Sequence, residues 1–237
     1  MPDDSFQEMF SSYMSPWIRM DDKAWNTLVH DVPIEVYEKE TVIYHQGDTP
    51  SRLYLVKEGR VCLDLYSKNG KKRSIYIADK GTCFGELSCL DGLPNYCTAT
   101  TRTATTLYLI SRKKFIEEVQ KNPQFTLSLL KALSLKTRLI TGLLEQLNFD
   151  DSHQRLYYSL IGLIERYSIQ TKEGYYRLNI KFTHQEMAHQ TGLSRVCISN
   201  IFLSLTNKGY IEKKDGYLII KDMNALRDYL MYEDLKE

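Results

Sequence analysis

The sequence predicts an α+β protein in three consecutive parts: a jelly-roll barrel (a double-stranded β-helix), one long helix and a winged helix-turn-helix. Three observations predict this order. Residues from about 34 to 110 contain short runs of β-branched and aromatic residues separated by glycines. A leucine-rich stretch follows, and the last third of the chain combines two helical patterns with an Asp-Gly turn. We assign residues 1–121 to the barrel domain, 122–149 to the long helix and 150–237 to the C-terminal domain.

The barrel segment consists of short apolar runs such as RLYLVKEG, RVCLDLYSKNG and RSIYIADKG. Many short antiparallel strands with turn glycines are typical of a sandwich or jelly-roll barrel. The pair Asn69-Gly70 predicts one hairpin turn. A helical preamble is expected at about Asp21–His30, before the first strand.

The long helix is expected to begin after Asn122, because Pro123 suits the first helical turn. A helix of about 25 residues is about 38 Å long. We expect one stripe to pack on the barrel and another on a second subunit, which makes this the dimerisation helix. Burial of the whole helix within one subunit is the alternative. The apolar residues near a heptad pattern, which Lys136 interrupts, are Leu129, Leu133, Ile140, Leu143 and Leu147.

A helix, a tight turn and a second helix are predicted over residues 183–211. Thr183 is a good N-cap, and Glu186 three residues later completes a capping box. Gly192 can end the first helix, and Ser194 can cap the second. This arrangement places a helix in the DNA major groove, although an ordinary helical hairpin has the same pattern. The apolar residues at helical spacing in the second helix are Val196, Ile198, Ile201, Phe202 and Leu205.

Asp215-Gly216 follows directly and predicts a two-residue hairpin turn. A helix-turn-helix with a small hairpin after it is a winged helix. The wing would place Lys213, Lys214 and Lys221 near the phosphate backbone, where contacts give affinity and register but carry no sequence information.

Composition sets bounds on the function. The net charge is only +1, which argues against a protein coated for unspecific nucleic-acid binding but allows a local DNA-binding face. No run of about 18 apolar residues is present, so we expect no membrane partner. The N-terminal stretch lacks the basic and then apolar pattern of a signal peptide, and we expect a cytoplasmic protein.

The cysteines and histidines predict neither a disulfide framework nor a metal site. No pair of cysteines has CxxC spacing, and the histidines do not pair with them at ligand spacing. Ordinary buried thiols are the default interpretation, and a redox switch at Cys97 or Cys197 is the alternative. The barrel segment contains only His45, so a metal-dependent enzyme on a jelly roll is disfavoured and we expect no enzyme. The five cysteines are Cys62, Cys83, Cys89, Cys97 and Cys197.

The order of these parts resembles the bacterial CRP/FNR family, that of the cyclic-AMP receptor protein and the fumarate–nitrate reductase regulator. Four segments between about residues 30 and 225 carry the resemblance: LYLVKEGRV, GTCFGELSCLDGLP, SRKKFIEEVQKNP and FTHQEMAHQTGLSRVCISNIFLSLTNKGYI. It implies a cyclic-nucleotide-binding-like barrel in a homodimeric transcription factor, such as an activator that contacts RNA polymerase. A small signal in the barrel would reorient two DNA-binding heads. A ligand-binding module without DNA binding is disfavoured by the helix-turn-helix and the wing.

Departures from the family pattern bear on the signal. In cyclic-nucleotide-binding members a Gly-Glu pair holds the ribose, and an arginine pairs with the cyclic phosphate. Gly85 and Glu86 match the first pair, whereas Cys97 stands where the arginine would be. A thiol cannot supply the charge-assisted donor that a desolvated phosphate needs. We expect an effector other than cyclic AMP, with cyclic-nucleotide binding as the alternative. Gly85 and Glu86 would then form a tight inter-strand turn with a satisfied carboxylate.

Other known signals of the family do not fit. No cysteine precedes Cys62, so an N-terminal iron–sulfur centre is not expected, and the histidines form no recognisable haem set. The NYCTATTRT stretch and Val196 resemble the halophenol-sensing members. We expect a small organic effector and no resident cofactor or metal. A phenolate could pair with Lys136 or Arg102. The residues expected around the effector are Gly85, Glu86, Leu87, Tyr96, Cys97, Thr98, Lys136, Ile140 and Thr141.

The recognition helix also departs from the family, whose three base-reading positions are often Arg, Glu and Arg. Here they are Arg195, Val196 and Asn200. Arginine can bridge guanine, asparagine can pair with adenine and valine can only touch a thymine methyl. We therefore predict a double-stranded, palindromic and AT-rich operator. The further residues expected at phosphates or bases are Thr183, His184, Gln185, Ser194 and Ser199.

Overall fold

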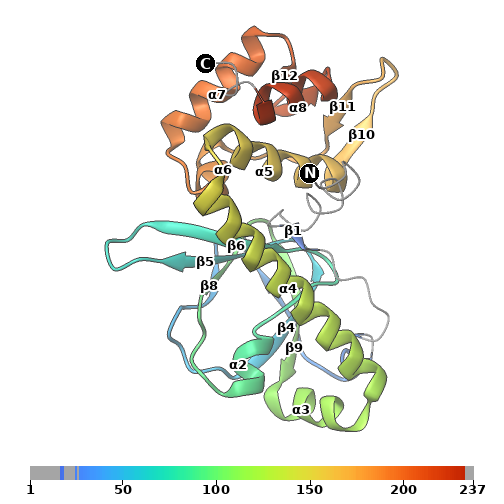
Figure 1. The fold of residues 1–237 in the computed structure, drawn as a ribbon. Coiled ribbons are helices and arrows are strands. Elements are labelled where there is room, and N and C mark those ends of the chain that lie inside the picture. The colour runs from blue at the N-terminus through green and yellow to red at the C-terminus, as the bar shows by residue number, and fades with distance from the viewer. Residues whose placement is uncertain (1–16, 19–24, 26, 233–237) are drawn as a thin grey trace. The chain divides into compact units, whose positions relative to one another are not determined.

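The computed structural model describes residues 17–18, 25 and 27–232 and contains two compact units (Figure 1). The barrel unit comprises Trp17–Thr137, and the C-terminal unit comprises residues 138–232 of the described chain. The helix predicted over 122–149 is α4 (Pro123–Phe149), and its residues are divided between the two units. The expected preamble lies partly outside the described residues; Trp25 and Thr27 have 3₁₀ conformation.

The barrel unit consists of two sheets, as expected for a jelly roll. One sheet has the order β1 (Trp17–Ile18), β6 (Lys72–Ala78), β5 (Val61–Tyr66), β8 (Thr98–Thr101) and β3 (Val42–Tyr44). The other has the order β2 (Ile34–Tyr37), β9 (Thr105–Ser111), β4 (Arg52–Glu58) and β7 (Cys83–Phe84). Among the described residues of this unit, two α-helices precede α4, namely α2 (Glu86–Asp91) and α3 (Arg112–Lys121).

Glycines with positive φ allow the chain to reverse between these strands. Gly70 has a φ of 73° and closes the predicted β5–β6 hairpin, in which Ser67 accepts a hydrogen bond from the Gly70 amide at 2.9 Å. Gly59 has a φ of 92°, and a Cβ there would lie 2.5 Å from the Ala104 carbonyl oxygen. Any side chain at position 59 would therefore displace the β4–β5 connection.

Aromatic side chains fill the core of the barrel unit. Phe84 stacks on Tyr54 with ring centroids 5.0 Å apart. Phe125, on the first turn of α4, meets the Trp25 ring edge-on at 5.1 Å. Both Phe84 and Phe125 are fully buried, and each such ring contributes roughly 1.5–3 kcal/mol through its burial. These contacts anchor the start of α4 within the barrel unit.

Helix α4 carries two apolar seams, each spaced by alternating steps of three and four residues. The predicted heptad set was wrong in mixing the two, because Leu129 and Leu143 are buried whereas Ile140 and Leu147 are half exposed. The buried seam consists of Phe125, Leu129, Ala132, Lys136, Leu139, Leu143 and Gln146. The exposed seam consists of Leu130, Leu133, Thr137, Ile140, Leu144 and Leu147.

The C-terminal unit contains helices and one small sheet. After α4 it contains α5 (Ser152–Tyr167), α6 (His184–Thr191), α7 (Arg195–Asn207) and α8 (Met223–Tyr232). Its sheet has the order β10 (Ser168–Gln170), β11 (Tyr176–Leu178), β13 (Tyr217–Ile220) and β12 (Ile211–Lys214). Asp151 caps α5 by accepting hydrogen bonds from the His153 and Gln154 amides at 2.6 and 2.9 Å. The hairpin β10–β11 extends the predicted wing into a four-stranded sheet.

Candidate nucleic-acid interface and effector site

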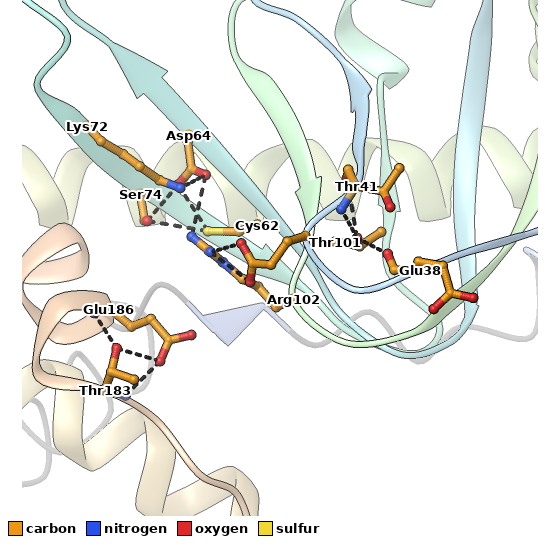
Figure 2. Close-up of polar contacts among 11 residues, drawn as sticks. Glu38, Thr41, Cys62, Asp64, Lys72, Ser74, Thr101, Arg102, Thr183 and Glu186 are labelled. Atoms are coloured by element: carbon orange, nitrogen blue, oxygen red, sulfur yellow. Dashed lines mark hydrogen bonds and ion pairs between the residues drawn. The ribbon is translucent and has the colours of Figure 1, made fainter.

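The helix-turn-helix has the local geometry predicted from its capping residues. Thr183 accepts a hydrogen bond from the Glu186 amide at 3.1 Å, and the Glu186 carboxylate accepts one from the Thr183 amide at 2.7 Å (Figure 2). Gly192 ends α6 with a φ of 73°, and the Ser194 hydroxyl caps α7 by accepting from the Cys197 amide. These caps satisfy amides that would otherwise lack partners. They fix both ends of the turn.

The apolar side of α7 fixes which residues face solvent. Ile198, Ile201 and Leu205 are buried. Arg195 and Asn200 are exposed, and Val196 is 68% exposed. The three predicted base-reading side chains therefore lie on the open side of the recognition helix, which suits entry into a major groove.

His184 and Ser199 join the two helices of the motif. The His184 Nδ1 lies 2.8 Å from the Ser199 hydroxyl, and the imidazole stacks on Phe202 with centroids 4.9 Å apart. Burial lowers the pKa of His184, and the positive charges of Lys213 and Arg195 lower it further. The contribution of Lys213 and Arg195 indicates that the potential at this surface is positive.

The wing turns at the predicted Asp-Gly pair. Asp215 and Gly216 have φ values of 54° and 81°, as a type I′ turn requires. Lys213 and Lys214 on β12 are exposed. Lys221 differs from the expectation, since its Nζ lies 2.6 Å from the Glu212 carboxylate and its charge is compensated within the sheet.

Two further cations lie at the wing and were not predicted from the sequence. The Arg177 guanidinium lies 4.2 Å from the centroid of the Tyr217 ring, and the Lys181 Nζ lies 4.8 Å from it. Cation–π contacts of this kind hold long side chains in place without neutralising them. The signal in the sequence was the interleaving of basic and aromatic residues over Tyr175–Phe182.

The expected effector residues of the barrel unit gather at the start of α2. Gly85 has a φ of 83°, and a Cβ there would lie 3.0 Å from the Arg52 carbonyl oxygen. The stretch predicted as a tight turn is instead a six-residue helix, because Gly85 and Gly92 both adopt the left-handed conformation at its ends. Glu86, the first residue of that helix, is only 1% exposed.

Glu86 and Lys136 form a buried ion pair. The Lys136 Nζ lies 2.8 Å from Glu86 Oε1 and donates to the Cys83 carbonyl oxygen at 2.9 Å. Burial opposes the charge of Lys136, but Glu86 more than offsets this and raises the pKa of Lys136. Glu86 Oε2 has no hydrogen-bond partner among the described residues. The expected carboxylate is therefore only half satisfied, and one oxygen can still accept a hydrogen bond.

A tyrosine hydroxyl contacts this pair, and two further tyrosines lie within electrostatic range of Glu86. The Lys136 Nζ lies 3.3 Å from the Tyr76 hydroxyl and 4.9 Å from the centre of that ring. Burial raises the pKa of Tyr44 and Tyr76 well above the ordinary tyrosine value, and neighbouring groups including Glu86 contribute. The pKa of Tyr96 is raised in the same direction, although 36% of this residue is exposed. These phenols therefore stay protonated and can donate or accept hydrogen bonds.

The remaining expected effector residues are distributed unevenly. Leu87 is half-buried on α2, Cys97 is buried, and buried Thr98 accepts a hydrogen bond from the Gln46 amide at 3.0 Å. Ile140 and Thr141 are exposed on the part of α4 that belongs to the C-terminal unit.

Arg102 lies in a second, separate polar cluster (Figure 2). Its guanidinium lies 3.1 Å from Glu40 and 3.8 Å from Asp64. Asp64 is fully buried and also meets the Lys72 Nζ at 2.7 Å and the Ser74 hydroxyl at 2.7 Å. Arg102 is therefore engaged with two carboxylates and does not replace the missing phosphate arginine.

The burial and pKa of the cysteine thiols bear on whether Cys97 or Cys197 acts as a redox switch. Burial raises the pKa of Cys97 to about 12, although hydrogen bonds from Tyr44 and Tyr96 act in the opposite direction. A thiol with so high a pKa has almost no reactive thiolate at neutral pH. Cys197 is half-buried on α7. In the part of the chain that the structure describes, no three His, Cys, Asp or Glu side chains form a metal-binding group.

Comparison with known protein families identifies both halves of the chain. The profile of the cyclic nucleotide-binding domain matches residues 34–122. The profile of the Crp-like helix-turn-helix domain matches residues 154–229. Fold and family matches thus define a transcriptional regulator with a cyclic nucleotide-binding-like barrel and a winged helix-turn-helix. The chain belongs to the CRP/FNR family.

Individual relatives support this assignment over most of the chain. It is 26% identical over 194 residues to the CRP-like cAMP-activated global transcriptional regulator of Mycobacterium tuberculosis, covering 82% of this chain and 86% of that protein. It is 26% identical over 197 residues to the anaerobic regulatory protein of Bacillus subtilis, covering 83% and 81% respectively.

Two solved structures share the fold. A CooA mutant from Carboxydothermus hydrogenoformans gives a TM-score of 0.75 at 21% identity, covering 90% of this chain and 98% of that one. CprK complexed with OCPA gives a TM-score of 0.70 at 16% identity, covering 90% and 97%. None of the helices in the described part of the chain is long and apolar enough to cross a membrane.

Proposed function

We propose that this CRP/FNR-type regulator binds a palindromic, AT-rich operator as a homodimer and is gated by a small organic effector other than cyclic AMP. It would act in the cytoplasm on RNA polymerase. The observation that carries the proposal is the exposed reading face of α7 beside uncompensated wing cations. Arg195 and Lys213 have no carboxylate partner among the described residues. Free cations beside a helix of this kind suit phosphates and base edges.

The base preference follows from the three reading side chains. Arg195 is the only guanine-reading residue among them, Asn200 suits adenine, and Val196 suits a thymine methyl. Ser199 is held by His184 at 2.8 Å, so its hydroxyl has a defined direction at this surface. These properties favour a half-site with at most one guanine read directly.

The homodimer is supported by the exposed seam of α4. Its members Ile140, Leu144 and Leu147 are 49%, 60% and 50% exposed. Their alternating three- and four-residue spacing is that of a coiled-coil seam, which a second copy of the same helix can cover. Two heads would then read two half-sites of a palindrome.

The effector proposal rests on the buried group around Glu86. A buried carboxylate oxygen without a partner costs free energy, and a ligand hydroxyl or amine could satisfy it. Lys136 is already paired with Glu86, so an incoming phenolate would have to share that cation. Two family members offer a precedent for small-molecule control: the M. tuberculosis relative is named cAMP-activated, and CprK is complexed with OCPA.

Selection of bound duplexes from a random DNA pool tests the DNA-reading part directly. We expect enrichment of palindromes whose half-sites are rich in A and T. Enrichment of a GC-rich palindrome would contradict the reading assigned to Val196 and Asn200. No enrichment above the pool would contradict sequence-specific binding altogether.

A further inference from the structure

A pocket of about 410 Å³ lies inside the winged helix, between the recognition helix α7 and the hairpin β12–β13. It belongs entirely to the C-terminal unit and is separate from the Glu86 group in the barrel. Its size falls within the range of about 300–1,000 Å³ that is usual for small-molecule sites. The proposed reading of DNA gives no role to its interior.

The interior of the pocket is apolar. Phe182 and Phe202 stand in its wall with ring centroids 6.1 Å apart. Ile211 and Leu218 are almost completely buried at its lining. Leu203 also lines it and is 60% exposed, so a side chain of the recognition helix leaves apolar surface open to water. A sugar–phosphate backbone is polar and would not fill such a space well, whereas an aromatic ring would.

The rim of the pocket is positively charged. Lys213 lines it, and no ion pair joins this lysine to a carboxylate in the described chain. Lys181 reaches the same edge, because its Nζ would lie 3.3 Å from a Cβ at Gly216. No Asp or Glu is among the lining residues. The lowered pKa of His184, due to burial and then to Lys213 and Arg195, agrees with a positive potential there.

We propose that this pocket binds a small amphipathic anion, such as an aromatic carboxylate or sulfonate. The ring would enter between Phe182, Phe202 and Leu203, and the acid group would meet Lys213 at the rim. The Lys213 ammonium suits the acid group of such a molecule, and the apolar wall suits its ring. Ligand binding itself is independent of the proposed function.

The position of the pocket predicts a consequence for DNA binding, and this part does rest on the proposed function. Ser199 and Asn200 line the same pocket and belong to the reading face of α7. An occupant would cover them and would compete with phosphates for Lys213. Ligand and operator therefore exclude each other, which gives the protein a control point in the DNA-binding unit itself.

Titration of the full-length protein with 8-anilinonaphthalene-1-sulfonate, observed by methyl NMR, tests the site. We expect saturable shifts in the methyl groups of Leu203, Ile211 and Leu218. The uncharged analogue N-phenyl-1-naphthylamine should bind more weakly, and Lys213→Gln should reduce that difference, with Lys181 remaining at the rim. Shifts confined to the barrel unit, or equal binding of both probes to the unmodified protein, would overturn the proposal.

A matched pair of variants separates this pocket from other apolar surfaces. Leu203→Asp places a carboxylate at the pocket, and we expect it to weaken sulfonate binding by about tenfold or more. Leu93→Asp is the control, because Leu93 is 62% exposed and lies in the barrel unit; it should leave the affinity unchanged. Equal effects of the two substitutions would contradict a site beside α7.

Competition with a selected duplex then tests the exclusion. We expect the fraction of sulfonate displaced to equal the fraction of protein that has bound the duplex. Simultaneous binding of both would refute the exclusion. If the sulfonate shifts these methyl signals but the protein binds no duplex, the pocket is confirmed and the proposed function is contradicted.

Discussion

The two units differ in where their most notable charged side chains lie. The barrel unit contains two ion pairs with a buried carboxylate: Glu86 with Lys136 at 2.8 Å, and Asp64 with Lys72 at 2.7 Å. In the C-terminal unit, Arg195 and Lys213 are exposed, and neither has a carboxylate partner in the described chain. The printed sequence does not reveal this difference, since its net charge is only +1.

The difference indicates where each kind of ligand can act. A charge removed from water needs compensation inside the protein, and disturbing the pair costs much free energy. A ligand at Glu86 must therefore join or rearrange an existing ion pair, which couples its binding to the barrel structure. Exposed cations keep their hydration until a polyanion arrives, so DNA can bind them without disturbing the fold.

The largest effect is expected from breaking the buried pair. Glu86→Gln should lower the free energy of unfolding by about 3–5 kcal/mol, because the Lys136 charge stays buried without its partner. The double variant Glu86→Gln with Lys136→Met should recover much of this loss. Urea unfolding of the purified variants measures both.

The exposed pair of the wing is the control for that experiment. Glu212 and Lys221 are as close, at 2.6 Å, but their side chains are 44% and 36% exposed. Glu212→Gln should leave the unfolding curve unchanged, because water replaces the lost partner. Equal effects of Glu86→Gln and Glu212→Gln would remove the contrast between the two units.

The next largest effect is expected from removing a base-reading side chain. Replacing Arg195 by alanine should cost about 1–3 kcal/mol of discrimination at the guanine it reads, because a bidentate donor is lost. Binding of the selected duplex and of its single-base variants, followed by fluorescence anisotropy, measures this loss. A variant that keeps full discrimination would exclude Arg195 from base contact.

A wing cation should affect affinity without affecting sequence preference. Lys213→Ala should weaken all duplexes alike and lower the salt slope of binding by about one. Lys221→Ala is the matched control, and its effect should be smaller because Lys221 already pairs with Glu212. Anisotropy titrations at several salt concentrations distinguish the two variants.

The smallest effect is expected from the protonation of His184. Its pKa is lowered in the free protein by burial, Lys213 and Arg195, and nearby phosphates in a complex would raise it. DNA binding then takes up a proton, so affinity should rise as pH falls from 8 towards 6. The gain should level off below the pKa of the free protein. His184→Asn should flatten the pH profile while Asn retains a polar side chain near Ser199.

Local chemistry made parts of the structure predictable. Thr183 with Glu186, and Ser194 with the Cys197 amide, are contacts within one helical turn, so the residue types alone indicate them. Asp215-Gly216 likewise needs only its own backbone preference. The exposed positions of Arg195 and Asn200 followed from the apolar spacing of α7, whereas Val196, counted with the apolar residues, is 68% exposed.

Contacts between distant residues were harder to predict. Lys136 lies 50 residues from Glu86 in the chain, and nothing local identifies them as partners. The six-residue helix after Gly85 is too short for a periodic signal. Helix α4 has two seams with the same repeat, so the sequence alone did not separate the buried Leu129 from the exposed Leu147.

Native mass spectrometry of the gently purified protein, with and without the selected duplex, tests most directly whether a small molecule in the barrel controls a DNA-binding dimer. We predict a dimer that carries a small organic mass and binds one palindromic duplex. A monomer that binds no duplex and carries no added mass would contradict both the exposed seam as a dimer interface and the barrel as a sensor.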